Sequence, residues 1–174
     1  MKRFFTLWGW LLALSLVFAG TLEAQDVYLQ EGHRSSVEAL AWSPDGTRMA
    51  SAGENESGYW QVKIWDMSTG RLLFSKPMPG YYNGGLAWNP DGTRLAAAVY
   101  SYNGGEFKIW DAESGEEVFS LKGRVTALAW SPDGRKIAAG AGNNQNNQLI
   151  VLDTGTGREL LSLRGHGGAI NSLS

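Results

Sequence analysis

The chain has 174 residues, 43% hydrophobic and 18% charged, which is enough for one domain with a buried core. Lys and Arg number 15 against 17 Asp and Glu, and this balance excludes the strongly basic surface of a general nucleic-acid binder. The absence of cysteine excludes disulfides, thiolate metal sites and cysteine nucleophiles, and two histidines leave little material for a metal cluster. We therefore expect no metal, no cofactor and no nucleic-acid partner.

Residues 1–24 have the pattern of a targeting segment. A short basic start, Lys2-Arg3, precedes an uncharged apolar run that continues to Leu22. This order predicts a secretory signal peptide, cleaved after Ala19 or Ala24. The alternative is an uncleaved membrane anchor, because the uncharged stretch is close to the roughly 20 residues that span a bilayer. We expect the remainder to be secreted or periplasmic, or else membrane-anchored and facing out of the cytoplasm.

The rest of the chain repeats a unit of similar length three times. Leu-Ala-Trp followed by Ser/Asn-Pro-Asp-Gly begins at Leu40, Leu86 and Leu128. In each unit the turn is followed by a small apolar strand, a third strand ending in aspartate, and a fourth apolar strand. A unit of 40 to 50 residues holding four short strands is typical of a propeller blade. We predict an all-β fold with blades of four antiparallel strands over 34–75, 80–121 and 123–163, and the start of a further blade over 165–174.

The segment from residue 27 to residue 174 resembles the WD-repeat β-propeller family. Gly32-His33 opens the first unit, and Trp-Asp closes the third strand of two units. The resemblance implies a polar network inside a blade, which matches only partly, because Glu54-Asn55-Glu56 stands where the family has an aspartate. The residues assigned to this structural network and its repeat equivalents are His33, Ser51, Trp65, Asp66, Trp110, Asp111 and Asp153.

Three blades form an incomplete ring, since propellers have 4–8 blades. Trp42, Trp88 and Trp130 occupy the same place in each unit, and we predict that all three pack between blades. An open set of blades exposes apolar flanks, so self-association through open blade edges is expected. We interpret the chain as a fragment of a longer propeller, with association of several chains into a ring as the alternative.

The extended connections at one rim are the candidate binding site. They are rich in Tyr, Trp, Arg and Asn, a composition favoured at recognition surfaces. Nearly every polar candidate for catalysis is copied by the repeat, which argues against an enzyme. The candidate protein-binding residues are Arg34, Tyr59, Trp60, Tyr81, Tyr82, Tyr100, Tyr102, Arg124 and Asn144.

The functional hypothesis is an exported, non-catalytic scaffold that binds other proteins through these rim loops. The alternative is an accessory propeller severed from a larger secreted enzyme of the peptidase kind or from a TolB-like envelope protein, because Ser-Pro-Asp-Gly turns also resemble those of such propellers. The membrane enters either hypothesis only through an uncleaved N-terminal segment.

Overall fold

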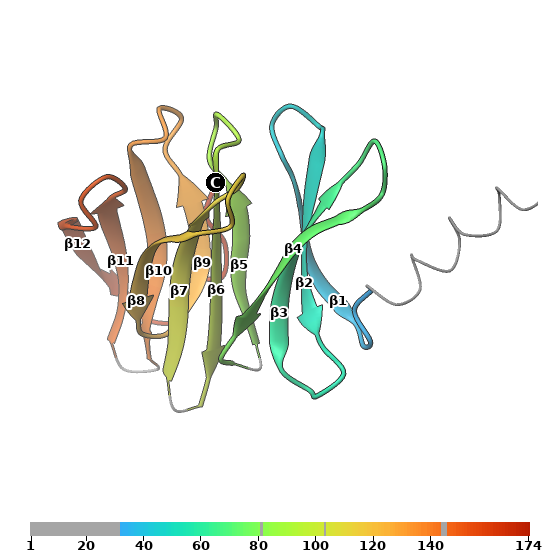
Figure 1. Cartoon of the computed structure of the whole chain (residues 1–174). Helices are drawn as coiled ribbons and strands as arrows, with labels where there is room; N and C mark the ends of the chain where they lie inside the picture. Colours follow the sequence, from blue (N-terminus) through green and yellow to red (C-terminus); the bar gives the residue numbers. More distant parts are fainter. Residues whose placement is uncertain (1–31, 81, 103, 144–145) are drawn as a thin grey trace, which may run out of the picture. The chain divides into compact units, whose positions relative to one another are not determined.

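The computed structural model describes residues 32–80, 82–102, 104–143 and 146–174. The predicted targeting segment, 1–24, lies outside the described residues. Within them the chain forms three four-stranded antiparallel sheets and no helix, and the sheets do not close a ring (Figure 1). No helix in this described part could cross a membrane. The predicted all-β class, with four strands to a blade, is confirmed.

The strands pair in chain order within each sheet, so every sheet is a meander. Blade 1 consists of β1 (Val37–Trp42), β2 (Arg48–Glu54), β3 (Trp60–Asp66) and β4 (Leu72–Met78). Blade 2 consists of β5 (Tyr82–Trp88), β6 (Arg94–Ser101), β7 (Gly104–Asp111) and β8 (Glu117–Lys122). Blade 3 consists of β9 (Val125–Trp130), β10 (Lys136–Asn143), β11 (Asn146–Asp153) and β12 (Glu159–His166).

Antiparallel pairing places the connections at two opposite edges. The Pro-Asp-Gly turns and the aspartate turns that join third to fourth strands lie at the edge named here the turn rim, at the top of Figure 1. The β2–β3, β6–β7 and β10–β11 hairpins and the β4–β5 and β8–β9 connections lie at the other edge, the hairpin rim. The predicted binding loops belong to the hairpin rim.

Burial follows the position of a strand within its blade. Residues Leu95–Val99 of β6 are buried without interruption, because this strand is covered on both faces by neighbouring blades. Every residue of the outermost strand of blade 3, β12, is exposed. The core therefore consists of two clusters, one at each junction between successive blades.

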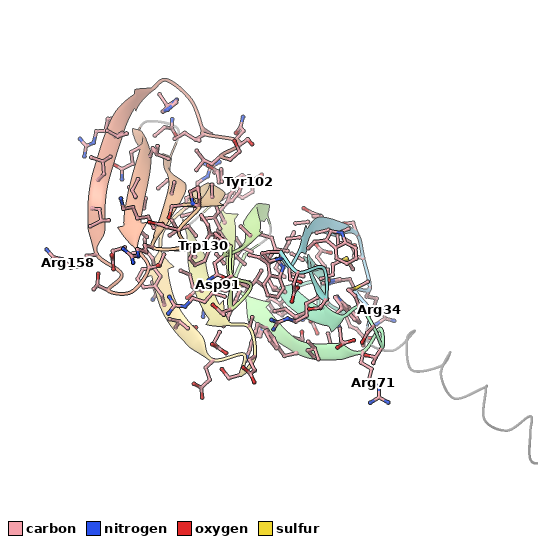
Figure 2. The ribbon with its side chains drawn as sticks, turned by 90° about the horizontal axis from the view of Figure 1, so that it is seen from above. Arg34, Arg71, Asp91, Tyr102, Trp130 and Arg158 are labelled. Atoms are coloured by element: carbon pink, nitrogen blue, oxygen red, sulfur yellow. The ribbon has the colours of Figure 1, made fainter. Side chains whose placement is uncertain are left out.

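The junctions repeat one hydrogen bond from a tryptophan. The Trp88 indole N–H donates to the Ala41 carbonyl of blade 1 over 3.0 Å, and the Trp130 indole donates to the Ala87 carbonyl of blade 2 over 3.0 Å. In Figure 2, seen from the turn rim, Trp130 lies between the second and third sheets. The prediction that these tryptophans pack between blades is correct for Trp88 and Trp130.

The prediction is wrong for Trp42, which is 58% exposed. A junction tryptophan is buried only by the sheet that supplies its carbonyl acceptor. Among the described residues no sheet covers this side of β1, and Val37 and Leu40 are exposed with it. The β1 flank, defined by Val37, Leu40 and Trp42, is therefore an exposed apolar surface.

Arginines reinforce the same junctions at the turn rim. The Arg48 guanidinium donates to the carbonyls of Gly92 and Ala112 of blade 2 over 3.1 and 2.8 Å, and lies 5.3 Å from the centre of the Trp88 ring. Arg94 donates in the same way to the Thr154 carbonyl of blade 3 over 3.0 Å. The planar guanidinium of Arg48 donates to two carbonyls at once and so links blade 1 to blade 2.

The C-terminal residues lie against blade 3 where a next inner strand would lie. The Thr126 hydroxyl donates to the Ile170 carbonyl over 2.8 Å, and a Cβ at Gly140 would meet the Ile170 side chain at 2.8 Å. The predicted start of a further blade, 165–174, thus includes a segment that packs on blade 3, although residues 167–174 form no strand.

Candidate functional site

A crevice opens at the hairpin rim between blades 2 and 3, with a volume of about 610 Å³. Two of the predicted rim residues, Tyr102 and Arg124, line it, and Tyr100 lies against Arg124. The β6–β7 hairpin supplies Tyr102, and the short β8–β9 connection supplies Arg124. This is the place where the structure brings candidate binding residues together, and it is called the rim crevice below.

Stacking fixes the cationic wall of the rim crevice. The Arg124 guanidinium lies 4.7 Å from the centre of the Tyr100 ring, within the range of a cation–π contact. Tyr102 at the tip of the hairpin is 90% exposed and is labelled in Figure 2. A partner can therefore contact the positioned guanidinium of Arg124 and the exposed, amphipathic ring of Tyr102.

Two glycines of blade 2 replace large side chains of blade 1, and one of them, Gly123, lines the rim crevice. In blade 1 the corresponding positions hold Trp60 and Met78, which are directly paired across β3 and β4 and are 0% and 1% exposed. Blade 2 has Gly105 and Gly123 in these places, joined by a hydrogen bond from the Gly123 N–H to the Gly105 carbonyl over 3.0 Å. Two large apolar side chains that fill the first junction are thus absent at the second.

Both glycines are required by the backbone. A Cβ at Gly105 would lie 2.5 Å from the Val99 carbonyl oxygen, and Gly123 has a φ of +147°, which L side chains rarely adopt. No atom lies within 4 Å of a Cβ built at Gly123. The backbone at Gly123 therefore faces open space at the rim crevice.

The burial of Trp60 corrects its assignment as a rim contact residue. Its side chain is fully buried with Val62, Met78 and Val99 in the core cluster between blades 1 and 2. As the first residue of β3, it continues the inward register of Val62 and Ile64, which places it in the core although an exposed loop precedes it. Trp60 is a packing residue.

Three of the other predicted rim residues are described by the structure, and they are spread over the hairpin rim. Arg34 makes an exposed ion pair with Glu56 over 3.4 Å, and Tyr59 is 60% exposed. The Tyr82 backbone pairs with Tyr100 at the start of β5. Two of the candidates, Tyr81 and Asn144, lie outside the described residues.

The polar network of blade 1 contains the three residues that the sequence assigned to it. Ser51 Oγ lies 2.8 Å from His33 Nε2, and the Trp65 indole N–H donates to the same oxygen over 2.8 Å. His33 Nδ1 is buried with no hydrogen-bond partner among the described residues, where the family resemblance implies an aspartate. Burial lowers the pKa of His33 below 6.5, and the nearby Lys63 ammonium lowers it further.

Blades 2 and 3 replace this network with apolar packing. Ala97 and Ala139 stand where blade 1 has Ser51, and both are buried. Trp110 is 2% exposed in the core, and Leu152 takes the tryptophan position in blade 3. The network is therefore a structural element of one blade.

The aspartates after the third strands close turns. One carboxylate oxygen of Asp66 accepts from the backbone N–H groups of Ser68 and Thr69 and from both hydroxyls. These hydrogen bonds, led by the Ser68 hydroxyl, lower the pKa of Asp66 to about 2. Asp111 and Asp153 accept in the same pattern, and the pKa of each is also lowered.

Metal-ligating side chains do not cluster among the described residues. No group of three His, Asp or Glu side chains there could hold a metal ion. A second cavity, of about 390 Å³ at the turn rim, is lined by Asp91, Asp133 and Asp153. Each of these carboxylates accepts a hydrogen bond from a backbone N–H group of its own turn, so each has a structural role.

Sequence reasoning missed several lining residues of the rim crevice. Leu121, Lys122 and Gln148 lie on strands β8 and β11 and are not among the predicted contact residues. The signal that could have found them is a comparison between repeats, where Gly105 and Gly123 replace Trp60 and Met78.

Comparison with known proteins agrees with this architecture. The family model "WD domain, G-beta repeat" matches residues 24–66 and 115–149. The small ribosomal subunit protein RACK1 of Caenorhabditis elegans is 32% identical over 96 residues, which are 55% of this chain and 27% of that protein. The periodic tryptophan protein 2 of Saccharomyces cerevisiae is 41% identical over 44 residues, which are 25% of this chain and 4% of that protein. The chain spans about a quarter or less of these two relatives.

Solved structures share the fold. The WD40 repeats of RRP9 superpose with a TM-score of 0.64 at 21% identity, covering 81% of this chain and 42% of that one. A eukaryotic initiation factor superposes with a TM-score of 0.62 at 13% identity, over 79% of this chain and 34% of that one. At these identities the likeness concerns the fold.

Proposed function

Because the chain belongs to the WD-repeat β-propeller family, we propose that it is a non-catalytic scaffold that binds a partner protein through its hairpin rim. WD-repeat proteins generally act as protein-interaction scaffolds. The observation that carries the proposal for this chain is the rim crevice, where Tyr102 and the stacked Arg124 border a cavity large enough for side chains of a partner. The aspartates that could suggest catalysis accept hydrogen bonds within their own turns.

The proposal is tested with variants on opposite rims. Tyr102→Ala and Lys122→Glu change exposed residues at the rim crevice, and Arg158→Glu is a matched charge change at an exposed position of the turn rim. Proteins cross-linked to the chain in its native host are quantified by mass spectrometry. We expect the rim variants to lose a partner that Arg158→Glu retains. Equal recovery with all three variants would contradict binding at the hairpin rim.

We also propose that the chain is exported. The support is the order of Lys2-Arg3 and the uncharged run to Leu22. Leu11→Arg puts a charge in the middle of this run, at a cost of about 2.5–3.5 kcal/mol for insertion. We expect the variant to stay in the cytoplasm and the natural chain to be found outside it, with an N-terminus after residue 19 or 24. Equal fractionation of the two chains would contradict export.

A further inference from the structure

We propose that the rim crevice receives an aromatic side chain from an extended segment of the partner, flanked in that segment by acidic residues. This inference rests on the proposed function and names the chemistry of the partner. It is drawn from a comparison of the two blade junctions within the same molecule, one of which is filled by the chain itself while the other is open.

The filled junction is the template. At the hairpin end of the junction between blades 1 and 2, Trp60 and Met78 pack against Val99 in a continuous core. The register of the repeats places Gly105 and Gly123 at the corresponding positions of blade 2, and of these two glycines Gly123 lines the rim crevice. The open junction therefore lacks an indole and a thioether that the same fold accommodates one blade earlier.

The walls of the rim crevice suit an aromatic ring. Leu121, Val125 and Ile150 supply apolar surface, and Val125 belongs to the buried core cluster. Gly104 and Gly123 expose backbone at the mouth, with no atom within 4 Å of a Cβ built at either. An extended segment can thus come close to the backbone while one of its side chains enters between the blades.

The charges at the rim crevice favour an acidic segment. Lys122 and Arg124 contribute two cations, and Glu159 contributes one anion. The guanidinium of Arg124 is already positioned on Tyr100, so less side-chain freedom is lost when a carboxylate binds. An aromatic residue between two acidic residues is therefore the complementary sequence.

The test uses three capped tripeptides: Ac-Asp-Trp-Asp-NH₂, Ac-Lys-Trp-Lys-NH₂ and Ac-Asp-Ala-Asp-NH₂. Binding to the full chain is measured by titration with amide chemical shifts as the readout. We expect the first peptide to bind saturably and to shift resonances at Tyr102, Gly104 and Gly123. The alanine peptide should bind at least about tenfold more weakly, because the buried ring is lost. The lysine peptide should be weaker by about two- to fivefold.

Two variants keep the inference falsifiable. Lys122→Glu changes an exposed side chain, and it should reverse the preference between the acidic and the basic peptide. Gly123→Met restores the residue of blade 1 and should abolish binding; circular dichroism establishes whether this strained variant folds. Equal affinity of the tryptophan and alanine peptides, or shifts confined to the turn rim, would overturn the inference. If the peptides fail to bind as expected but the rim variants still lose their cross-linked partner, this inference is wrong and the proposed function is not. The two failures are therefore distinguishable.

Discussion

The turn aspartates are held charged by hydrogen bonds and not by burial. The Asp45 carboxylate accepts from the Ser43 hydroxyl over 2.6 Å and from the Thr47 N–H over 3.0 Å, and these bonds lower the pKa of Asp45 to about 2. Asp66 has the same value for the same reason. Since the folded pKa lies below the ordinary 3.8, these groups stabilise the fold above that value and lose their contribution as the pH falls toward 2.

This predicts acid sensitivity in a defined range. The thermal midpoint should be lower at pH 2 than at pH 5, with most of the loss below pH 3.8. His33, whose folded pKa lies below 6.5, should add a smaller loss that begins as the pH falls through 6.5. Asp45→Asn should have a shallower decrease, because it removes one titrating carboxyl. A midpoint that stays constant from pH 5 to pH 2 would show that the turns do not depend on ionised aspartate.

Single residues also mark what sequence reasoning could not reach. Trp60 follows a polar loop and is the first residue of β3. Whether its side chain points into the core depends on where the strand begins, and sequence propensity does not locate that boundary to a single residue. Gly105 and Gly123 lie far apart in sequence and become one feature only through the pairing of β7 with β8. The rim crevice therefore needed the register of the strands, whereas Tyr100, Tyr102 and Arg124 were predicted from the place of their loops in the repeat and from the composition of those loops.

At the scale of the element, the junction between blades is the unit of stability. Each junction joins an indole N–H to a carbonyl of the preceding blade, and an arginine to two carbonyls of the following blade at the first junction and to one at the second. Lys136 takes the arginine position in blade 3, and a lysine cannot supply the same planar fork. The repeat made the strands predictable, because four elements recur in one order. It did not indicate which of the equivalent tryptophans is covered by an adjacent blade.

The same substitution at equivalent positions separates these cases. Trp88→Ala removes an indole that is 8% exposed and should lower the free energy of unfolding by about 3–5 kcal/mol. Trp42→Ala removes one that is 58% exposed and should lower it by less than about 1 kcal/mol. Chemical denaturation followed by circular dichroism measures both. Equal losses would indicate that both tryptophans are covered in solution.

At the scale of the whole molecule, the exposed β1 flank predicts association. Val37, Leu40 and Trp42 form an apolar surface between the two rims, and such surfaces favour contact with other chains. Light scattering after size-exclusion chromatography should show a mass that increases with concentration. Trp42→Lys should shift the chain toward the monomer, while Arg71→Ala, an exposed change at the turn rim, should not. A monomer at all concentrations would contradict association through this flank.

The central claim, that a partner occupies the hairpin rim between blades 2 and 3, is tested most directly by a footprint. Amide hydrogen exchange of the full chain is compared with and without the partner identified by cross-linking. The account predicts slower exchange in the β6–β7 hairpin and at residues 121–125, with residues 89–94 and 131–135 of the turn rim unchanged. Protection that falls on the turn rim and leaves the rim crevice unaffected would contradict it.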